Sequence, residues 1–197
     1  TWGTTMAAIA KYLQPSTKKN VQTVYLKGTV SNSSRNNYSS IITQRFNASF
    51  HTQTEILPVP VIFDNQKTRD LVLQDQFIKR IIKQGQDAQI ALFTVGTTRP
   101  EAMLFQLGYF TQQQIDFLEA HAVGDVLSQF ITKNGTIAAS KIAERTVSLP
   151  LADLKHKRQS ILVAGGIEKL PAIHAALTGG YANVLITDLN NAEKLLK

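Results

Sequence analysis

Short apolar runs that alternate with helical patterns constrain the fold of this chain more than any other feature. The runs lie at residues 21–26, 59–63, 90–95, 161–164 and 184–187, and each is rich in Val, Ile or Leu. Continuous apolar runs of this length are typical of strands that are buried on both faces of a parallel sheet. Their alternation with helices predicts an α/β fold with a doubly wound, mostly parallel sheet.

Helical periodicity fills the intervals between the runs. Met6, Ile9 and Leu13 share one face of a first predicted helix. No repeat or linker divides the chain, so we expect one domain over residues 1–197. Further patterns predict helices within residues 41–50, 71–82 (one long helix or two joined ones), 110–121, 170–177 and 192–196.

Composition and charge narrow the chemistry. Hydrophobic residues make up 43% of the chain and charged residues 18%, which indicates a folded protein rather than a disordered one. The chain has no cysteine, its four histidines are scattered, and no apolar run approaches the ~18 residues that span a bilayer. We therefore expect no metal, no other cofactor and no membrane partner. The net charge of +7 indicates an anionic partner, either a phosphorylated small molecule or a nucleic acid.

The turn before the first predicted helix is a candidate phosphate site. Ligands of open α/β sheets bind beyond the carboxyl ends of the strands. Gly3, Thr4 and Thr5 form a turn before a helix, of the kind that normally follows a strand in such folds. Free backbone N–H groups and the helix dipole favour an anion there. The simpler interpretation is that a threonine caps the helix.

Lys27 and Gly28 follow the first apolar run. A lysine at the end of a strand is commonly a solvated tip. A lysine that is buried in a crevice instead has a lowered pKa and can attack a carbonyl group. Gly28 would let the backbone approach a ligand closely, and we include it in the predicted phosphate site.

Polar residues follow other elements as well. Asp64 follows the run at residues 59–63, and Asp125 follows the helix predicted to end near His121. Both are predicted either to bind sugar hydroxyls or to serve as a helix cap (Asp64) and a turn residue (Asp125). Gly96 opens a small-residue turn. Lys169 falls in the first turn of a predicted helix, where a cation opposes the helix dipole by about 0.3–1 kcal/mol and a bound anion would offset this cost. Together these residues predict a site for a phosphorylated sugar.

At these residues the chain resembles the effector-binding domain of SorC-type bacterial transcriptional regulators, and within them the deoxyribonucleoside regulators. The resemblance runs in order along most of the chain. It rests on Trp2-Gly3-Thr4-Thr5-Met6, Leu26-Lys27-Gly28, Phe63-Asp64-Asn65, Phe93-Thr94-Val95-Gly96-Thr97, Leu107-Gly108-Tyr109-Phe110, Val123-Gly124-Asp125, Val163-Ala164-Gly165-Gly166 and residues 176–186.

The resemblance implies the fold of sugar-phosphate isomerases and glucosamine-phosphate deaminases. It implies the C-terminal part of a cytoplasmic repressor whose helix-turn-helix domain, which binds operator DNA, is absent from this chain. The turn at the first helix points the same way, since such a turn normally follows a strand, and we expect at least one strand upstream of Thr1. The implied protein is a homodimer or tetramer that leaves its operator when the effector binds.

The implied effector is deoxyribose 5-phosphate or a related sugar phosphate. Lys27 would form an imine with its open-chain aldehyde, and Gly3, Thr4 and Thr5 would hold its phosphate. Asp125 and Lys169 would face the sugar, and Asn37 and Tyr38 fall where a further ligand contact is expected. Thr29 departs from the family, which often has a second glycine there, and a β-branched residue would be strained if this position needs a positive φ.

Two other functions are alternatives to an effector-sensing domain. The first is a sugar-phosphate isomerase or aldolase, in which Asp64 or Asp125 would act as the base. The second is direct nucleic-acid binding through the basic run at residues 155–158. We interpret this run as a solvated turn, because the aromatic residues that single-strand binders use do not accompany it.

Overall fold

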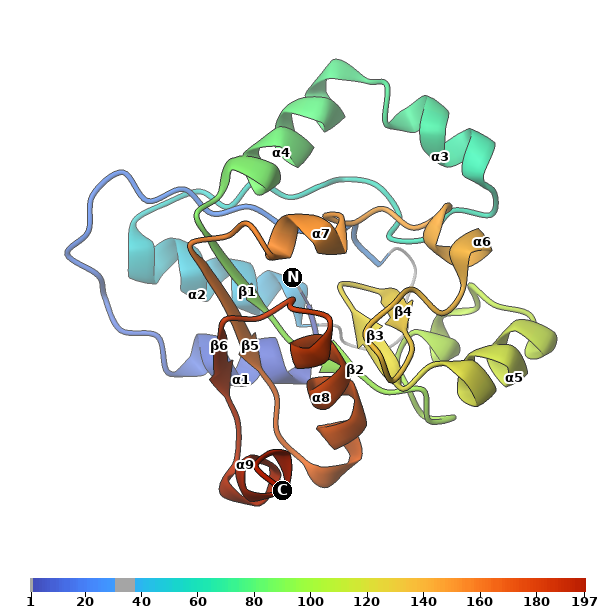
Figure 1. The fold of residues 1–197 in the computed structure, drawn as a ribbon. Helices are drawn as coiled ribbons and strands as arrows, with labels where there is room; N and C mark the ends of the chain where they lie inside the picture. The colour runs from blue at the N-terminus through green and yellow to red at the C-terminus, as the bar shows by residue number, and fades with distance from the viewer. Residues whose placement is uncertain (1, 31–37) are drawn as a thin grey trace.

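Two small sheets surrounded by helices make up the fold (Figure 1). The computed structural model describes residues 2–30 and 38–197. One sheet is parallel, with the strand order β1-β5-β6, and the other is antiparallel, with the order β2-β3-β4. The strands are β1 (Ile90–Phe93), β2 (Val95–Gly96), β3 (Gly124–Val126), β4 (Gln129–Ile131), β5 (Gln159–Val163) and β6 (Val184–Ile186).

Each segment with predicted helical periodicity contains a helix, but the short helices at residues 140–143 and 151–154 were not predicted. The segment at residues 71–82 contributes to two helices, α3 and α4, rather than to one. The α-helices are α1 (Thr4–Lys11), α2 (Ser39–Phe50), α3 (Gln66–Val72), α4 (Gln76–Asp87), α5 (Gln112–His121), α6 (Ser140–Ala143), α7 (Leu151–Leu154), α8 (Leu170–Thr178) and α9 (Leu189–Leu195), with short 3₁₀ helices η1 (Phe105–Leu107) and η2 (Ile167–Lys169).

Three of the five predicted strands form the parallel sheet, which confirms the α/β class. The other two predictions, at residues 21–26 and 59–63, are wrong in detail, because these segments make isolated bridges and no regular strand. Val24 pairs with Glu55, and Thr29 pairs with Pro60. A proline has no backbone N–H to donate, so Pro58 and Pro60 interrupt any continuous ladder in this part of the chain.

The parallel sheet separates two packed layers. Leu92 of β1 packs against the cluster of Met6, Ala10 and Ile42, which comes from α1 and α2. The residues on either side of Leu92 belong instead to the main core, to which α8 contributes four fully buried residues. Successive residues of a strand point to opposite faces, so β1 is covered on both sides, as the continuous apolar run predicts.

The chain leaves the parallel sheet at the end of β1 and enters the antiparallel sheet one residue later. Strand β2 pairs with β3, and α8 packs beside this second sheet. The cavity described below lies where the chain passes from one sheet to the other, rather than along one edge of a single sheet. No helix in the described part of the chain is both long enough and apolar enough to cross a bilayer.

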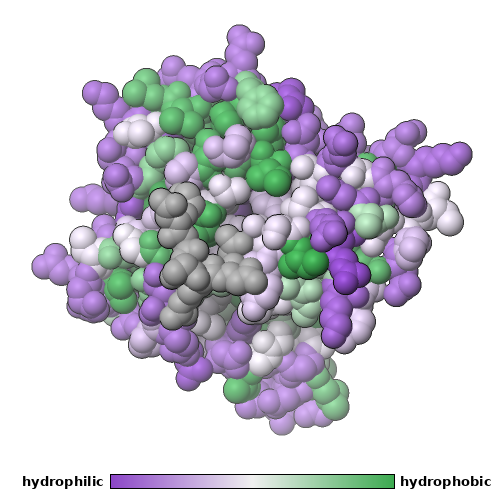
Figure 2. All heavy atoms as spheres, turned by 180° about the vertical axis from the view of Figure 1, so that it is seen from behind, coloured by the Kyte–Doolittle hydropathy of each residue, from purple (hydrophilic) through white to green (hydrophobic). Residues whose placement is uncertain are grey.

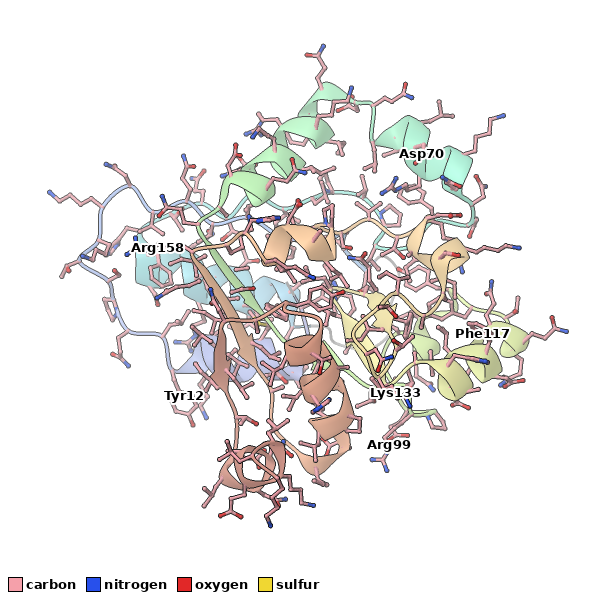
Figure 3. The ribbon with its side chains drawn as sticks, viewed as in Figure 1. Tyr12, Asp70, Arg99, Phe117, Lys133 and Arg158 are labelled. Carbon is pink, nitrogen blue, oxygen red and sulfur yellow. The ribbon has the colours of Figure 1, made fainter. Side chains whose placement is uncertain are left out.

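Seen from behind, the surface has one region where hydrophobic side chains gather, with polar side chains around it (Figure 2). The exposed large hydrophobic residues include Leu71 of α3 and Phe77 of α4. Charged side chains such as Lys133 and Arg99 point outward (Figure 3). The positive charges are therefore spread over the surface as well as placed in the site described below.

Candidate functional site

A cavity of about 180 Å³ opens where β1 passes into β2, next to the start of α1 and the end of η2. Most of the residues that the sequence singled out come together in it. Its lining consists of Trp2, Gly3, Thr4, Thr5, Lys27, Thr94, Val95, Gly96, Thr97, Ala102, Met103, Leu104, Asp125 and Lys169.

A larger groove of about 530 Å³ lies elsewhere, and residues such as Gln86, Asp153 and Lys157 line it. This groove is at the amino ends of β1 and β5, whereas ligands of such sheets bind at the carboxyl ends. The smaller cavity is therefore the candidate site, because position and chemistry agree there.

Lys27 is the central group of the cavity. Its side chain is buried, so the interpretation as a solvated strand tip is wrong. The Nζ atom donates a hydrogen bond to Ser128 Oγ at 2.9 Å and lies 3.7 Å from the centre of the Trp2 ring. Burial lowers the pKa of Lys27 from 10.5 to about 8, and the nearby carboxylate of Asp125 opposes this shift.

Asp125 is buried beside Lys27, in β3 rather than in a turn. Its Oδ2 accepts a hydrogen bond from the backbone N–H of Ser128 at 2.8 Å. Burial raises the pKa of Asp125, while Lys27, the Ser128 N–H and Lys169 act in the opposite direction. A Cβ atom at Gly96 would lie 2.0 Å from Asp125 Oδ1, so only a glycine at this position leaves the carboxylate its place.

A cation and a helix terminus form the other side of the cavity. Helix α1 begins at Thr4, and Gly3 before it has a φ of 115°, which favours glycine. The first N–H groups of a helix have no partner within the helix. Lys169 Nζ donates to Thr5 Oγ1 at 3.1 Å, which brings an ammonium group to this terminus. Burial lowers the pKa of Lys169, and Glu168 and Asp125 oppose the shift.

Gly28 and Thr29 follow Lys27 in the chain, but neither is among the described residues that line the cavity. A Cβ atom at Gly28 would lie 2.7 Å from the carbonyl oxygens of Val59 and Pro60, so this glycine permits close packing of two segments. Thr29 donates through its hydroxyl to Val59 O and has no positive φ, so the expected strain does not arise.

The remaining predicted residues lie away from the cavity or outside the described residues. Asp64 is exposed and acts electrostatically on Arg145. The cap of α3 is Asn65 rather than Asp64. Tyr38 precedes α2 and packs beside the α1–α2 cluster. Asn37 belongs to residues 31–37, which lie outside the described residues.

The sequence assigned no role to several residues of the site, among them Trp2 and Ser128. Trp2 belongs to the motif Trp2-Gly3-Thr4-Thr5-Met6, but only the structure shows that its ring lies under the Lys27 ammonium. Ser128 lies 101 residues from Lys27 along the chain, and no local pattern connects them. The apolar residues Ala102, Met103 and Leu104 also line the cavity and follow no strand directly.

The basic run at residues 155–158 forms a turn between α7 and β5, as predicted. Arg158 points away from the body of the protein (Figure 3). Lys157 is buried instead, and its Nζ donates to the carbonyl oxygen of Gly85 at 2.8 Å, near the end of α4. This lysine therefore stabilises a helix end rather than extending a basic surface.

Comparison with known proteins relates the chain to transcriptional regulators. The deoxyribonucleoside regulator of Bacillus subtilis (strain 168) is 49% identical over 195 residues, which cover 99% of this chain and 62% of that protein. The sorbitol operon regulator of Klebsiella pneumoniae is 29% identical, and 63% of its length is covered. The chain thus spans about three-fifths of the length of these relatives.

Solved structures show the same fold. The full-length sorbitol operon regulator SorC from Klebsiella pneumoniae matches with a TM-score of 0.88 and 29% identity, over 100% of this chain and 65% of that one. A transcriptional regulator from Streptococcus pneumoniae TIGR4 matches in fold with a TM-score of 0.89 at 23% identity, over 99% of this chain and 75% of that one. Residues 1–197 match the sugar-binding domain family (Sugar-bind). The chain belongs to this family, and in sequence and fold it is similar to the matching part of SorC-type transcriptional regulators.

Proposed function

We propose that this domain senses deoxyribose 5-phosphate and holds it as an imine on Lys27. One observation supports this most strongly: the buried amine of Lys27 shares a small cavity with a helix N-terminus and the Lys169 ammonium. The 49% identity to a deoxyribonucleoside regulator supports the choice of sugar.

Burial makes the Lys27 amine reactive. An imine forms only from an uncharged amine, and a pKa of about 8 leaves roughly a tenth of the amine uncharged at pH 7. With the ordinary value of 10.5 the uncharged fraction would be about 0.03%. Deoxyribose 5-phosphate carries its phosphate on the C5 oxygen, so it cannot close a six-membered ring, and its open-chain aldehyde is accessible to the amine.

The two ends of the effector would be held by different chemistry. The phosphate would bind at Gly3, Thr4 and Thr5, where the N-terminus of α1 and Lys169 supply positive charge. The hydroxyl groups of the sugar would bind Asp125, a carboxylate acceptor within the same cavity.

The regulatory part of the proposal concerns the whole protein. A helix-turn-helix domain would precede this domain and bind operator DNA. The effector would bind one conformation more tightly than the other and shift the DNA-binding equilibrium by that difference in affinity. A dimer or tetramer suits this role, because operators mirror the symmetry of the protein that binds them.

Borohydride reduction tests the imine. Borohydride with deoxyribose 5-phosphate should fix the sugar irreversibly on Lys27, and mass spectrometry of the digested protein should find the added mass on this residue. Lys27→Ala should remain unlabelled, whereas the exposed Lys133→Ala should be labelled like the parent protein. Equal labelling of Lys27→Ala and the parent would refute the proposal.

Thermal unfolding tests the choice of ligand. A ligand that binds only the folded state raises stability by RT ln(1 + [L]/Kd). Deoxyribose 5-phosphate should raise the unfolding temperature more than ribose 5-phosphate or fructose phosphates do at the same concentration. If all of these sugar phosphates raised the unfolding temperature equally, the choice of deoxyribose 5-phosphate would be refuted, while the imine on Lys27 would not be.

A second candidate function is a sugar-phosphate isomerase or aldolase. The observation that favours it is the raised pKa of Asp125 beside the Lys27 amine, since such a carboxyl group can serve as a general acid or base. Turnover of deoxyribose 5-phosphate or ribose 5-phosphate by the purified protein would establish this function. Stable binding without turnover would support the sensor.

A further inference from the structure

The tip of the hairpin between β3 and β4 is buried, although hairpin tips normally lie at the surface. Val126 pairs with Gln129, so the connecting loop contains only Leu127 and Ser128. Leu127 is 3% exposed and Ser128 is 0% exposed. The polar side chain of Ser128 is therefore completely enclosed by the protein.

The backbone of this loop is strained. Leu127 has a φ of 51° and Ser128 a φ of 66°, so both adopt the left-handed conformation of a type I′ turn. Sequences such as Asn-Gly normally occupy such a turn, because other residues are disfavoured there. Strain of this kind persists only where the surrounding structure enforces it, and it concentrates at functional sites.

Ser128 connects the two central groups of the cavity. Its hydroxyl accepts the hydrogen bond from Lys27 Nζ at 2.9 Å. Its backbone N–H donates to Asp125 Oδ2 at 2.8 Å. Because the strained turn fixes both atoms of Ser128, it also fixes the distance between the amine and the carboxylate.

We propose that Ser128 is a positioning residue, whose hydroxyl group holds Lys27 Nζ in the orientation that attacks the carbonyl group of the effector. This inference rests on the proposed imine function and adds a residue that acts on it through Lys27. The strained turn keeps the hydroxyl in place while the effector enters and leaves.

The hydroxyl group suits each state of the nitrogen. The uncharged amine donates one N–H to Ser128 and keeps its lone pair for the carbonyl carbon. Addition gives a carbinolamine, which takes up one proton from water, loses its hydroxyl group as water and leaves an iminium ion. The iminium nitrogen retains one hydrogen, which can still be donated to the neutral Ser128 oxygen.

A carboxylate in place of this hydroxyl would act differently, because it would favour the unreactive ammonium form. In the described part of the chain, Asp125 is the charged group that acts on the Lys27 ammonium. Lys169 acts on Asp125 from its other side. The neutral contact from Ser128 therefore orients Lys27 with no second negative charge beside it.

Two variants of Ser128 separate the hydroxyl from the backbone. Ser128→Gly and Ser128→Ala both lack the hydroxyl, but only glycine adopts the left-handed conformation without strain. The measurement is the rate of labelling by deoxyribose 5-phosphate and cyanoborohydride between pH 6 and pH 10. Both variants should lower the plateau of the rate at high pH by about five- to tenfold, which corresponds to one hydrogen bond. Both should also move the midpoint to lower pH, because the ammonium loses an acceptor.

Ser160→Ala is the matched control. Ser160 is also buried, and its hydroxyl donates to Tyr181 O at 2.6 Å, away from the cavity. This variant should keep the labelling rate and the midpoint of the parent protein. If Ser128→Gly labels like the parent while Ser128→Ala does not, the backbone alone matters and the inference is wrong. Unchanged labelling in both variants would refute it as well.

Acetylation of Lys27 by trace acetic anhydride separates this inference from the proposed function, because it requires no effector. The midpoint of its pH profile should fall in both Ser128 variants and stay in Ser160→Ala. A parent protein that reacts with the anhydride but is not labelled by the sugar would refute the imine alone. An unchanged acetylation midpoint in the Ser128 variants would refute the contact with Ser128, whatever the sugar does.

Discussion

Replacing Lys27 by methionine should change how the stability of the protein depends on pH. Methionine is unbranched and only one atom shorter than lysine, and it removes the amine. Burial lowers the pKa of Lys27 from 10.5 to about 8 in the folded state. Since each pKa unit corresponds to 1.36 kcal/mol, the folded state carries a penalty of roughly 3 kcal/mol for the ammonium below pH 8.

The sign follows from the protons bound by each state. Between pH 8 and pH 10.5 the unfolded chain holds a proton on Lys27 that the folded protein has released. Stability therefore rises with pH in this window, and the full penalty for the ammonium applies once the pH falls below about 8. From pH 7 to pH 10 the free energy of unfolding of the parent should rise by about 2.5 kcal/mol relative to Lys27→Met.

Urea unfolding at several pH values from 7 to 10 measures this difference. Lys27→Met also loses the hydrogen bond to Ser128, which changes the free energy of unfolding by a similar amount at every pH. The change of this free energy with pH therefore reports the cost of burying the ammonium alone. Lys133→Met is the matched control, because its side chain is exposed and its removal leaves the cavity intact. Parallel curves for the parent and Lys27→Met across this range would refute the lowered pKa.

Two further predictions concern Gly96 and Asp188. Gly96→Ala would place a Cβ atom 2.0 Å from Asp125 Oδ1, so it should displace this carboxylate. The variant should then lose the rise in unfolding temperature that deoxyribose 5-phosphate causes, and an unchanged rise would contradict this prediction. Asp188 caps α9 and accepts the Gly166 N–H, and these backbone hydrogen bonds lower its pKa. Its contribution to stability should therefore be present at neutral pH and lost in acid as the pH falls through this lowered pKa, and Asp188→Asn should unfold with less pH dependence in acid.

The strands of the parallel sheet and most helices were predictable, because each has a local signal. Continuous apolar runs predicted β1, β5 and β6, and periodicity predicted α1 and α8. The antiparallel sheet was not predicted. Its strands have only two or three residues, which is too short for any period to be recognised.

The candidate site was predicted in part. Lys27 was found because it follows an apolar run, Asp125 because it follows a predicted helix, and Lys169 because it falls in the first turn of another. The structure brings all three to one cavity. The same reasoning placed Asp64 in the site, yet this residue is exposed and lies outside the cavity lining. The segments before Lys27 and before Asp64 both make isolated bridges only, so the end of an apolar run did not by itself decide which of the two residues reaches the cavity.

The sequence by itself determined the α/β class and the set of charged groups available for a phosphorylated ligand. Only the tertiary structure decided that Lys27 is buried between Trp2 and Ser128. Burial depends on packing between segments that lie far apart along the chain. The reactivity of an amine depends in turn on that burial, because removal from water destabilises its charged form.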